Sequence, residues 1–197
     1  MEPPPAFSPW FKELSLQTLN AYWGAFTVNL LAGWGLDYAV LSPGSRCTPL
    51  TYAFARNPHV EAIPVLDERS AGFLALGLAK RTGKPVVLVC TSGTAVANYY
   101  PAVIEARYSH TPLILLTADR PPELRHCHSG QTIDQVGIYG NYPTFEAEAD
   151  FPDHSRNAAE KHAGLLRQAW EAATGLEAGP AHINFPFRDP LHPHASL

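Results

Sequence analysis

The residues of this sequence that could do chemistry lie in short polar segments, each of which follows an apolar run. Glu68 matters first, because a carboxyl group beside apolar residues can hold or transfer a proton. Arg46 and Arg120 matter next, because a guanidinium group forms paired hydrogen bonds with carboxylates and phosphates. The polar segments are Ser42–Arg46, Asp67–Arg69, Thr91–Thr94, Asp119–Arg120 with Gln131 a short loop later, and Arg188–Asp189. Together they suggest a site that holds a proton and binds an acidic compound.

Each of these residues also has a purely structural explanation. Turns between strands and helices need glycine, serine and aspartate, so the glycines and serines are equally well explained as turn residues. Glu68 could be a surface glutamate at the start of the following helix. Arginine is no special turn former, but Arg46 or Arg120 could form a surface ion pair. Asp67 and Asp119 are the nearest candidates as partners.

The apolar runs between the polar segments predict the elements that must position them. Runs rich in β-branched residues predict strands at 37–41, 62–66, 85–90, 113–117 and 181–185, with a short extra strand at 144–147. Helical periodicity predicts helices at 18–34, 69–81, 95–110 and 158–174. The strands are apolar throughout, which is typical of a parallel sheet covered on both faces. We therefore predict an α/β fold, with a doubly wound, mostly parallel sheet of five to six strands and helices on both faces.

In such a sheet the carboxyl ends of the strands meet at one edge, and ligands bind there. The polar segments all follow predicted strands, so we expect them to gather at that edge. No segment resembles a better-known catalytic loop. The sequence contains neither a GxGxxG after the first strand nor a GxSxG elbow, and residues 77–84 have the wrong spacing for a phosphate loop. Adjacent side chains such as those of His126, Cys127 and His128 cannot easily converge on one metal ion, so we predict no metal site there.

Composition narrows the class of protein. The chain has 197 residues and is 46% hydrophobic, which is enough to bury a core. Its formal net charge of −4 argues against nucleic-acid binding, and no apolar run approaches the roughly 18 residues of a membrane span. No secretory signal is visible, and the three cysteines are far apart, so we expect a cytoplasmic location. We predict a loose proline-rich segment at 1–12, one domain at 13–190 and a tail at 191–197 that leads to further domains.

Five sequence blocks make the chain recognisable. They are Ser-Pro-Gly-Ser-Arg at 42–46, Asp-Glu-Arg-Ser-Ala-Gly-Phe at 67–73, Thr-Ser-Gly-Thr at 91–94, Ala-Asp-Arg-Pro-Pro-Glu-Leu at 118–124 and Gly-Gln-Thr-Ile-Asp-Gln at 130–135. In order and spacing they closely resemble the pyrimidine-binding domain of thiamine-diphosphate enzymes. Within that superfamily they are most similar to the MenD family, the 2-succinyl-5-enolpyruvyl-6-hydroxy-3-cyclohexene-1-carboxylate synthases of menaquinone and phylloquinone biosynthesis. The first and fourth blocks are the more particular to this family, and the resemblance covers roughly residues 14–190.

The resemblance implies that Glu68 is both catalytic and cofactor-binding. A carboxyl group that touches the far ring nitrogen of the aminopyrimidine favours the imino tautomer, which is the form that acts as a base. Assistance of this kind is worth roughly a hundred- to ten-thousand-fold in rate. The resemblance also implies that the segment around Thr91, Gly93 and Thr94 shapes the pocket around the pyrimidine, mainly through backbone groups.

The substrates implied by the resemblance are 2-oxoglutarate and isochorismate. The first would lose carbon dioxide, and the resulting succinyl carbanion equivalent would add to the ring of the second. Both substrates are carboxylates, so cationic side chains are expected at the mouth of the site. The residues that would contact isochorismate by the family's pattern are Ser45, Arg46, Arg120 and Gln131.

Part of the thiamine machinery is not in this sequence. Thiamine enzymes hold the diphosphate through Mg²⁺ or Mn²⁺, using a Gly-Asp-Gly sequence and a later Asn, and no Gly-Asp-Gly occurs here. The resemblance therefore implies an amino-terminal third of a longer enzyme, whose metal is held by an absent domain. In the family, the diphosphate-binding domain of a second subunit completes the site, so we expect a homodimer or homotetramer and an inactive isolated chain.

Two alternatives stay open from the sequence. The chain could be the pyrimidine domain of another thiamine-dependent decarboxylase or carboligase, such as a relative of acetolactate synthase. A small 2-oxo-acid acceptor would not need Arg46 and Arg120, which separates this alternative from the first. The chain could also be a non-catalytic assembly domain that has kept the fold.

Overall fold

The computed structural model describes residues 16–192, with side chains from Leu19 onward. Six strands form one sheet in the order β2-β1-β3-β4-β6-β5. Their bounds are Tyr38–Ser42 (β1), Glu61–Pro64 (β2), Val86–Cys90 (β3), Leu113–Asp119 (β4), Phe145–Glu148 (β5) and Pro180–Pro186 (β6). The predicted loose segment 1–12 and residues 193–197 of the predicted tail lie outside the described part of the chain.

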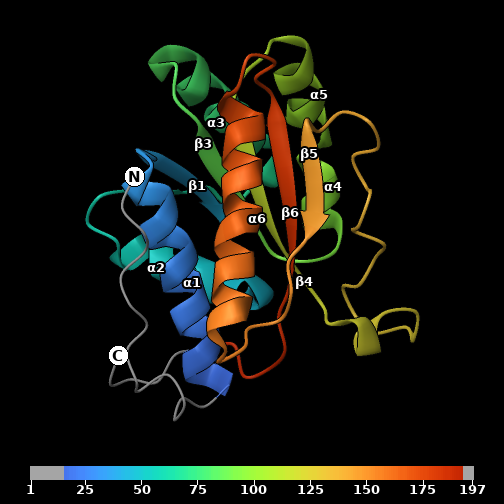
Figure 1. Ribbon diagram of the computed structural model, residues 1–197. Helices are drawn as coiled ribbons and strands as arrows, with labels where there is room; N and C mark the ends of the chain where they lie inside the picture. The colour runs from blue at the N-terminus through green and yellow to red at the C-terminus, as the bar shows by residue number, and fades with distance from the viewer. Residues whose placement is uncertain (1–15, 193–197) are drawn as a thin grey trace.

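Every pairing in the sheet is parallel, and helices cover both faces. On one face lie α1 (Leu16–Gly33), α2 (Thr48–Arg56) and α6 (Arg156–Thr174), and on the other lie α3 (Glu68–Thr82), α4 (Thr94–Asn98) and α5 (Tyr100–Tyr108). Figure 1 shows α1 and α6 in front of the sheet. Two short 3₁₀ helices, Ser45–Cys47 and Pro122–Leu124, lie in connections. The predicted doubly wound α/β fold is confirmed.

Each face of the sheet has its own apolar core. Leu31, Phe54 and Leu166 bring α1, α2 and α6 together on one side. Val96 and Val103 do the same for α4 and α5 on the other side. Burial of each large apolar side chain contributes about 1.5–3 kcal/mol, which explains why the strands need to be apolar on both sides. Among residues 16–192, no helix is both long enough and apolar enough to cross a membrane.

Two helices differ from the prediction. The sequence analysis did not predict α2, although Leu50, Ala53 and Phe54 carry a helical apolar pattern and are buried. The stretch predicted as one helix over 95–110 is two, α4 and α5, which meet at Tyr99. Pro101 lacks the N–H that would bond to the preceding turn, so a single helix cannot run through it.

A buried histidine links α6 to α1. His162 Nε2 lies 2.8 Å from Thr27 Oγ1, and the ring of Trp23 packs against the imidazole at a centroid distance of 4.5 Å. The other ring nitrogen, Nδ1, is buried and has no hydrogen-bond partner among the described residues. Burial lowers the pKa of His162 from 6.5 to about 3, and the negative charge of Asp150 opposes this shift only in part. The imidazole is therefore neutral in the folded protein near neutral pH.

His162 should make the fold sensitive to acid. The unfolded chain binds a proton at this residue near pH 6.5, whereas the folded chain does so only near pH 3. Its contribution to stability is therefore complete above the unfolded pKa and falls as the pH decreases toward the folded one, by up to about 1.4 kcal/mol per pH unit. In urea unfolding at several pH values, His162→Gln should flatten this decline, because glutamine is polar but does not titrate.

His59 is exposed and provides the control. His59→Gln should keep the pH dependence of the unmodified chain. The same decline in the unmodified chain and in His162→Gln would contradict the assignment.

Candidate functional site

The register of the sheet brings the polar segments together. Ser42 of β1 pairs with Cys90 of β3, Cys90 with Thr117 of β4, and Thr117 with Asn184 of β6. These residues form a row across four adjacent strands at their carboxyl ends. The turns that follow the four strands therefore start from the same edge, as the sequence predicts.

Two glycines let these turns pack against each other. A Cβ atom at Gly44 would lie 2.5 Å from the Cβ of Thr91, so the turn after β1 closely approaches the turn after β3. Gly93 has a φ of +84°, and a Cβ there would lie 2.9 Å from Cγ of Gln131. Gln131 itself has a left-handed backbone with a φ of 58°, which is uncommon outside glycine. Residues 44, 91, 93 and 131 thus form one contiguous group.

Glu68 is the first residue of α3, and its neighbour frees it from a capping role. Asp67 is the N-cap, and its Oδ1 accepts a hydrogen bond of 2.7 Å from the backbone N–H of Ser70. Glu68 is half-buried, and its carboxylate has no hydrogen-bond or ion-pair partner among residues 16–192. Asp67 therefore makes the capping hydrogen bond, while Glu68 lies in the first turn of α3, where a negative charge still stabilises the helix start.

The carboxylate of Glu68 acts electrostatically on the buried edge of the sheet. Burial raises the pKa of the Cys47 thiol to about 11, and the charge of Glu68 adds to this shift. The same two causes are among those that raise the pKa values of Cys90 and Tyr99. Glu68 therefore lies near the carboxyl ends of β1 and β3, where an unpaired acidic group is exceptional.

Arg46 is almost completely buried, with 8% of its surface exposed. Its Nη1 donates to the backbone oxygen of Phe187 and to Oδ2 of Asp189, at 2.9 Å each. Its Nε is buried and has no partner within the described part of the chain. The ion-pair partner of Arg46 is thus Asp189, and neither Asp67 nor Asp119 takes that place. The Asp189 side chain is 67% exposed, so this pair lies at the rim of the fold.

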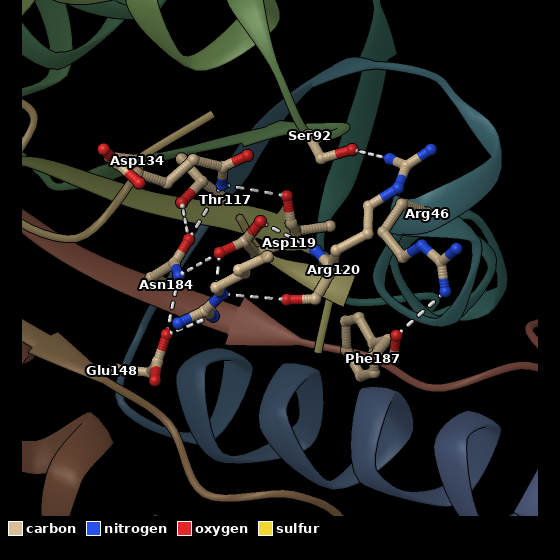
Figure 2. Close-up of polar contacts among 12 residues, drawn as sticks. Arg46, Ser92, Thr117, Asp119, Arg120, Asp134, Glu148, Asn184 and Phe187 are labelled. Atoms are coloured by element: carbon tan, nitrogen blue, oxygen red, sulfur yellow. Dashed lines mark hydrogen bonds and ion pairs between the residues drawn. The ribbon is translucent and has the colours of Figure 1, made fainter. Parts of the chain in front are cut away.

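Arg120 approaches Arg46 from the end of β4. Its guanidinium group donates to Oγ of Ser92, a contact that Figure 2 shows beside Arg46. Burial lowers the pKa of Arg120, and the like charge of Arg46 lowers it further. Gln131 joins them, because its Nε2 donates to the backbone oxygen of Ser92 at 3.0 Å. Ser92 links the arginine to the glutamine, and the sequence analysis gave it no role.

The structure separates the predicted site residues into groups. Arg46, Arg120 and Gln131 come together around Ser92, next to Thr91 and Gly93. Glu68 lies on the side of Cys47, and its charge is not among the causes that shift the pKa of Arg120. The remaining predicted residues, Ser45 and Thr94, have exposed side chains at the edge of this group. The carboxylate and the guanidinium groups therefore occupy two neighbouring parts of one edge.

A buried acidic cluster lies beneath the arginines. Asp119 is 1% exposed, and its Oδ2 is 2.8 Å from Nη2 of Arg125. The same nitrogen is 2.5 Å from Oε2 of Glu148. Burial raises the pKa of Asp119, although its hydrogen bond with Asn184 and the charge of Arg125 act in the opposite direction. The guanidinium group of Arg125 therefore bridges the two carboxylates. The sequence did not indicate this ion pair, because Glu148 is far from Arg125 in the chain.

We also looked for metal ligands. Within residues 16–192, no group of three or more histidine, cysteine, aspartate or glutamate side chains converges as metal ligands would. The three cysteines, Cys47, Cys90 and Cys127, are free thiols.

Comparison with known proteins identifies the family. Residues 23–138 match the family described as thiamine pyrophosphate enzyme, N-terminal TPP binding domain. The chain belongs to this family. Thiamine pyrophosphate is another name for thiamine diphosphate, so the predicted resemblance is confirmed. The match spans α1 to the loop after β4, which includes both parts of the site.

Individual relatives carry a more specific name. The chain is similar to proteins named 2-succinyl-5-enolpyruvyl-6-hydroxy-3-cyclohexene-1-carboxylate synthase from three organisms. Identity is 56% for Microcystis aeruginosa, covering 93% of this chain and 32% of the relative, and 56% for Gloeothece citriformis, covering 91% and 31%. For Acaryochloris marina it is 54%, covering 93% and 31%. The chain thus spans about a third of the length of the curated relatives it matches, and these names do not favour the acetolactate-synthase alternative.

Gly93 provides a test of the packing between the turns. Gly93→Ala should lower the free energy of unfolding by about 1–3 kcal/mol, because alanine at this φ is strained and its Cβ collides with Gln131. Gly77→Ala is the matched control, since a Cβ at this exposed position in α3 meets nothing within 4 Å. It should be neutral or stabilising by up to about 1 kcal/mol. Equal effects in urea unfolding would show that the contact is absent.

Proposed function

We propose that the chain is the pyrimidine-binding domain of a thiamine-diphosphate-dependent 2-succinyl-5-enolpyruvyl-6-hydroxy-3-cyclohexene-1-carboxylate synthase. Its substrates would be 2-oxoglutarate and isochorismate, in menaquinone or phylloquinone biosynthesis. The observation that carries the proposal is the half-buried carboxylate of Glu68, which no side chain of the described residues neutralises, on the same edge of the sheet as a pair of arginines. The names of the relatives support the choice of substrates.

The residues present fit the aminopyrimidine ring of thiamine diphosphate. A ring nitrogen can share a proton with the Glu68 carboxylate, which lacks any other partner in the described chain. Gly44, Thr91 and Gly93 make a close-packed turn in which a side chain at either glycine would collide. Bound thiamine diphosphate supplies a nucleophilic carbon that adds to 2-oxo acids and allows the release of carbon dioxide. The part of Glu68 is to hold a proton at the ring nitrogen and so to set the ring's tautomer.

The arginines would bind the carboxylates of isochorismate. Arg46 and Arg120 are close enough for the charge of one to lower the pKa of the other, so an anion between them would relieve this repulsion. The guanidinium group of Arg46 is almost completely buried, whereas the carboxylate of its partner Asp189 is 67% exposed. A substrate carboxylate could therefore reach Arg46 by taking the place of Asp189. Gln131 and Ser45 would add hydrogen bonds at the rim.

The remaining parts of the enzyme would come from elsewhere. Mg²⁺ or Mn²⁺ and the diphosphate would be held by a diphosphate-binding domain of a second subunit, in a homodimer or homotetramer, so the isolated chain would be inactive. A cytoplasmic location suits the three free thiols. This domain itself would then contribute two functions: Glu68 would hold the proton, and the arginines would bind the acceptor substrate.

Glu68→Gln in the full-length enzyme tests the catalytic role. Glutamine has nearly the same shape but cannot share a proton with the ring, so kcat should fall about a hundred- to ten-thousand-fold while the melting temperature is kept. Asp67→Asn is the matched control, because the neighbouring carboxylate is exposed and only caps α3. It should keep kcat within about threefold while costing up to about 1 kcal/mol of stability. Normal turnover by Glu68→Gln would favour the non-catalytic assembly domain.

Arg120→Ala in the full-length enzyme tests the choice of acceptor. Loss of a charge-assisted hydrogen bond is worth about 1.5–3 kcal/mol, so the Michaelis constant for isochorismate should rise about ten- to a hundredfold. Decarboxylation of 2-oxoglutarate alone should change little. Lys84→Ala is the control, because Lys84 precedes β3 at the opposite end of the sheet and pairs with Asp37. Equal losses in both half-reactions would contradict the assignment.

A further inference from the structure

Asn184 lies at the centre of a buried hydrogen-bond network beneath the site. It is 1% exposed, and its Nδ2 donates to Oδ2 of Asp119 at 2.9 Å and to Oε2 of Glu148 at 3.0 Å. Its Oδ1 accepts from Oγ1 of Thr117 at 3.1 Å and from Nε2 of Gln135 at 2.9 Å. Figure 2 shows Thr117, Asp119 and Glu148 around Asn184. All four hydrogen-bonding positions of the amide are therefore used.

One arm of this network ends at the turn after β3. Gln135 donates from Nε2 to Asn184 and also to the backbone oxygen of Ala118, at 3.1 Å. Its Oε1 accepts from the backbone N–H of Gly93 at 2.8 Å. The Gln135 amide is thus held by three hydrogen bonds, one of them to Asn184. Through Gln135, the N–H of Gly93 is linked to a side chain in β6.

The other arm ends at Arg120. Asp119 accepts from Asn184 at Oδ2, and its Oδ1 accepts from the backbone N–H of Arg120 at 2.7 Å. Arg125 and Glu148 hold the same carboxylate from the side. The backbone from which Arg120 reaches Ser92 is therefore tied to the same amide that fixes Gln135.

The donors and acceptors of this network can be arranged in only one way. Carboxylates accept and do not donate, so the nitrogen of Asn184 must face Asp119 and Glu148. Its oxygen must then face Thr117 and Gln135. A reversed amide would lose its bonds to Asp119, Glu148 and Gln135 within a buried space, where each unpaired polar group costs about 1–3 kcal/mol. Asn184 is accordingly held in one orientation.

We propose that Asn184 is a positioning residue that sets the turn holding Gly93 and the backbone of Arg120 relative to each other. This inference rests on the proposed function, in which the first group faces the pyrimidine and the second binds the acceptor substrate. Asn184 touches neither ligand. It acts on one through Gln135 and on the other through Asp119.

Asn184→Asp in the full-length enzyme tests this proposal. Aspartate has nearly the same shape but replaces the two donated hydrogen bonds with a carboxylate that faces Asp119 and Glu148. We expect the Michaelis constant for isochorismate and the dissociation constant for thiamine diphosphate each to rise at least fivefold, with a smaller change in kcat. Hydrogen exchange, followed by mass spectrometry, should quicken at least fivefold in peptides that contain Gly93 and in peptides that contain Arg120.

Two further variants keep the test decisive. Thr27→Val removes a buried hydrogen bond to His162 on the other face of the sheet, so it reports general destabilisation alone and should leave both constants unchanged. Gln135→Glu removes the bond to Asn184 together with the link to Gly93, but Asp119 keeps its own bonds to Asn184 Nδ2 and to the N–H of Arg120, so the variant should raise the dissociation constant for thiamine diphosphate and quicken exchange at Gly93. The isochorismate constant should stay within twofold. If Asn184→Asp does not fold, this selective effect of Gln135→Glu still decides the matter.

The proposal is overturned if Asn184→Asp only reduces the amount of active enzyme, with both constants unchanged as in Thr27→Val. It is also overturned if Gln135→Glu changes the constants for thiamine diphosphate and isochorismate equally, or changes neither of them. The exchange measurement needs no substrate, so it separates this proposal from the proposed function. Quicker exchange at Gly93 and Arg120 in an enzyme that does not use isochorismate would sustain the positioning role and refute the reaction.

Discussion

A parallel sheet buried on both faces places every polar turn of this protein at one edge. Strands β1, β3, β4 and β6 pair in register at Ser42, Cys90, Thr117 and Asn184, at or within two residues of their carboxyl ends. The helices on the two faces exclude water from the strands, so the polar groups at this edge must satisfy one another or a ligand. The close approach of the turns at Gly44 and Gly93 follows from this crowding, and so does the dense hydrogen bonding around Asn184.

The charges at this edge are distributed unevenly, and the unevenness suits an acidic ligand. Arg125 lies between two carboxylates, those of Asp119 and Glu148, so its single positive charge is already engaged without any ligand. Arg46 and Arg120 have no comparable enclosure, because the first pairs with a carboxylate at the rim and the second donates to a serine hydroxyl. Positive charge therefore remains near the surface, while the negative charge that could cancel it is used up below.

The sequence predicts the parts of this arrangement that depend on local pattern. Five apolar runs and the short extra strand correspond to the six strands, and Arg120 and Gln131 both bond to Ser92 near Arg46. What could not be predicted depends on register between distant segments. The contacts of Asn184 with Thr117 and Asp119 join residues 65 or more positions apart, and only the pairing of β4 with β6 brings them face to face. The helix α2 was not predicted, because its nine residues are fewer than the window over which helical periodicity becomes distinct.

The placement of Glu68 shows how much can depend on one position in a helix start. The first turn of a helix presents unpaired N–H groups that attract any nearby carboxylate. Asp67 satisfies the N–H of Ser70, so the helix does not need the side chain that follows. The charge of Glu68 acts on the thiols of Cys47 and Cys90, and its half-buried carboxylate has no partner within residues 16–192. Asp67 thus caps the helix, and the adjacent Glu68 is left for the proposed catalytic role. One carboxylate could not perform both tasks.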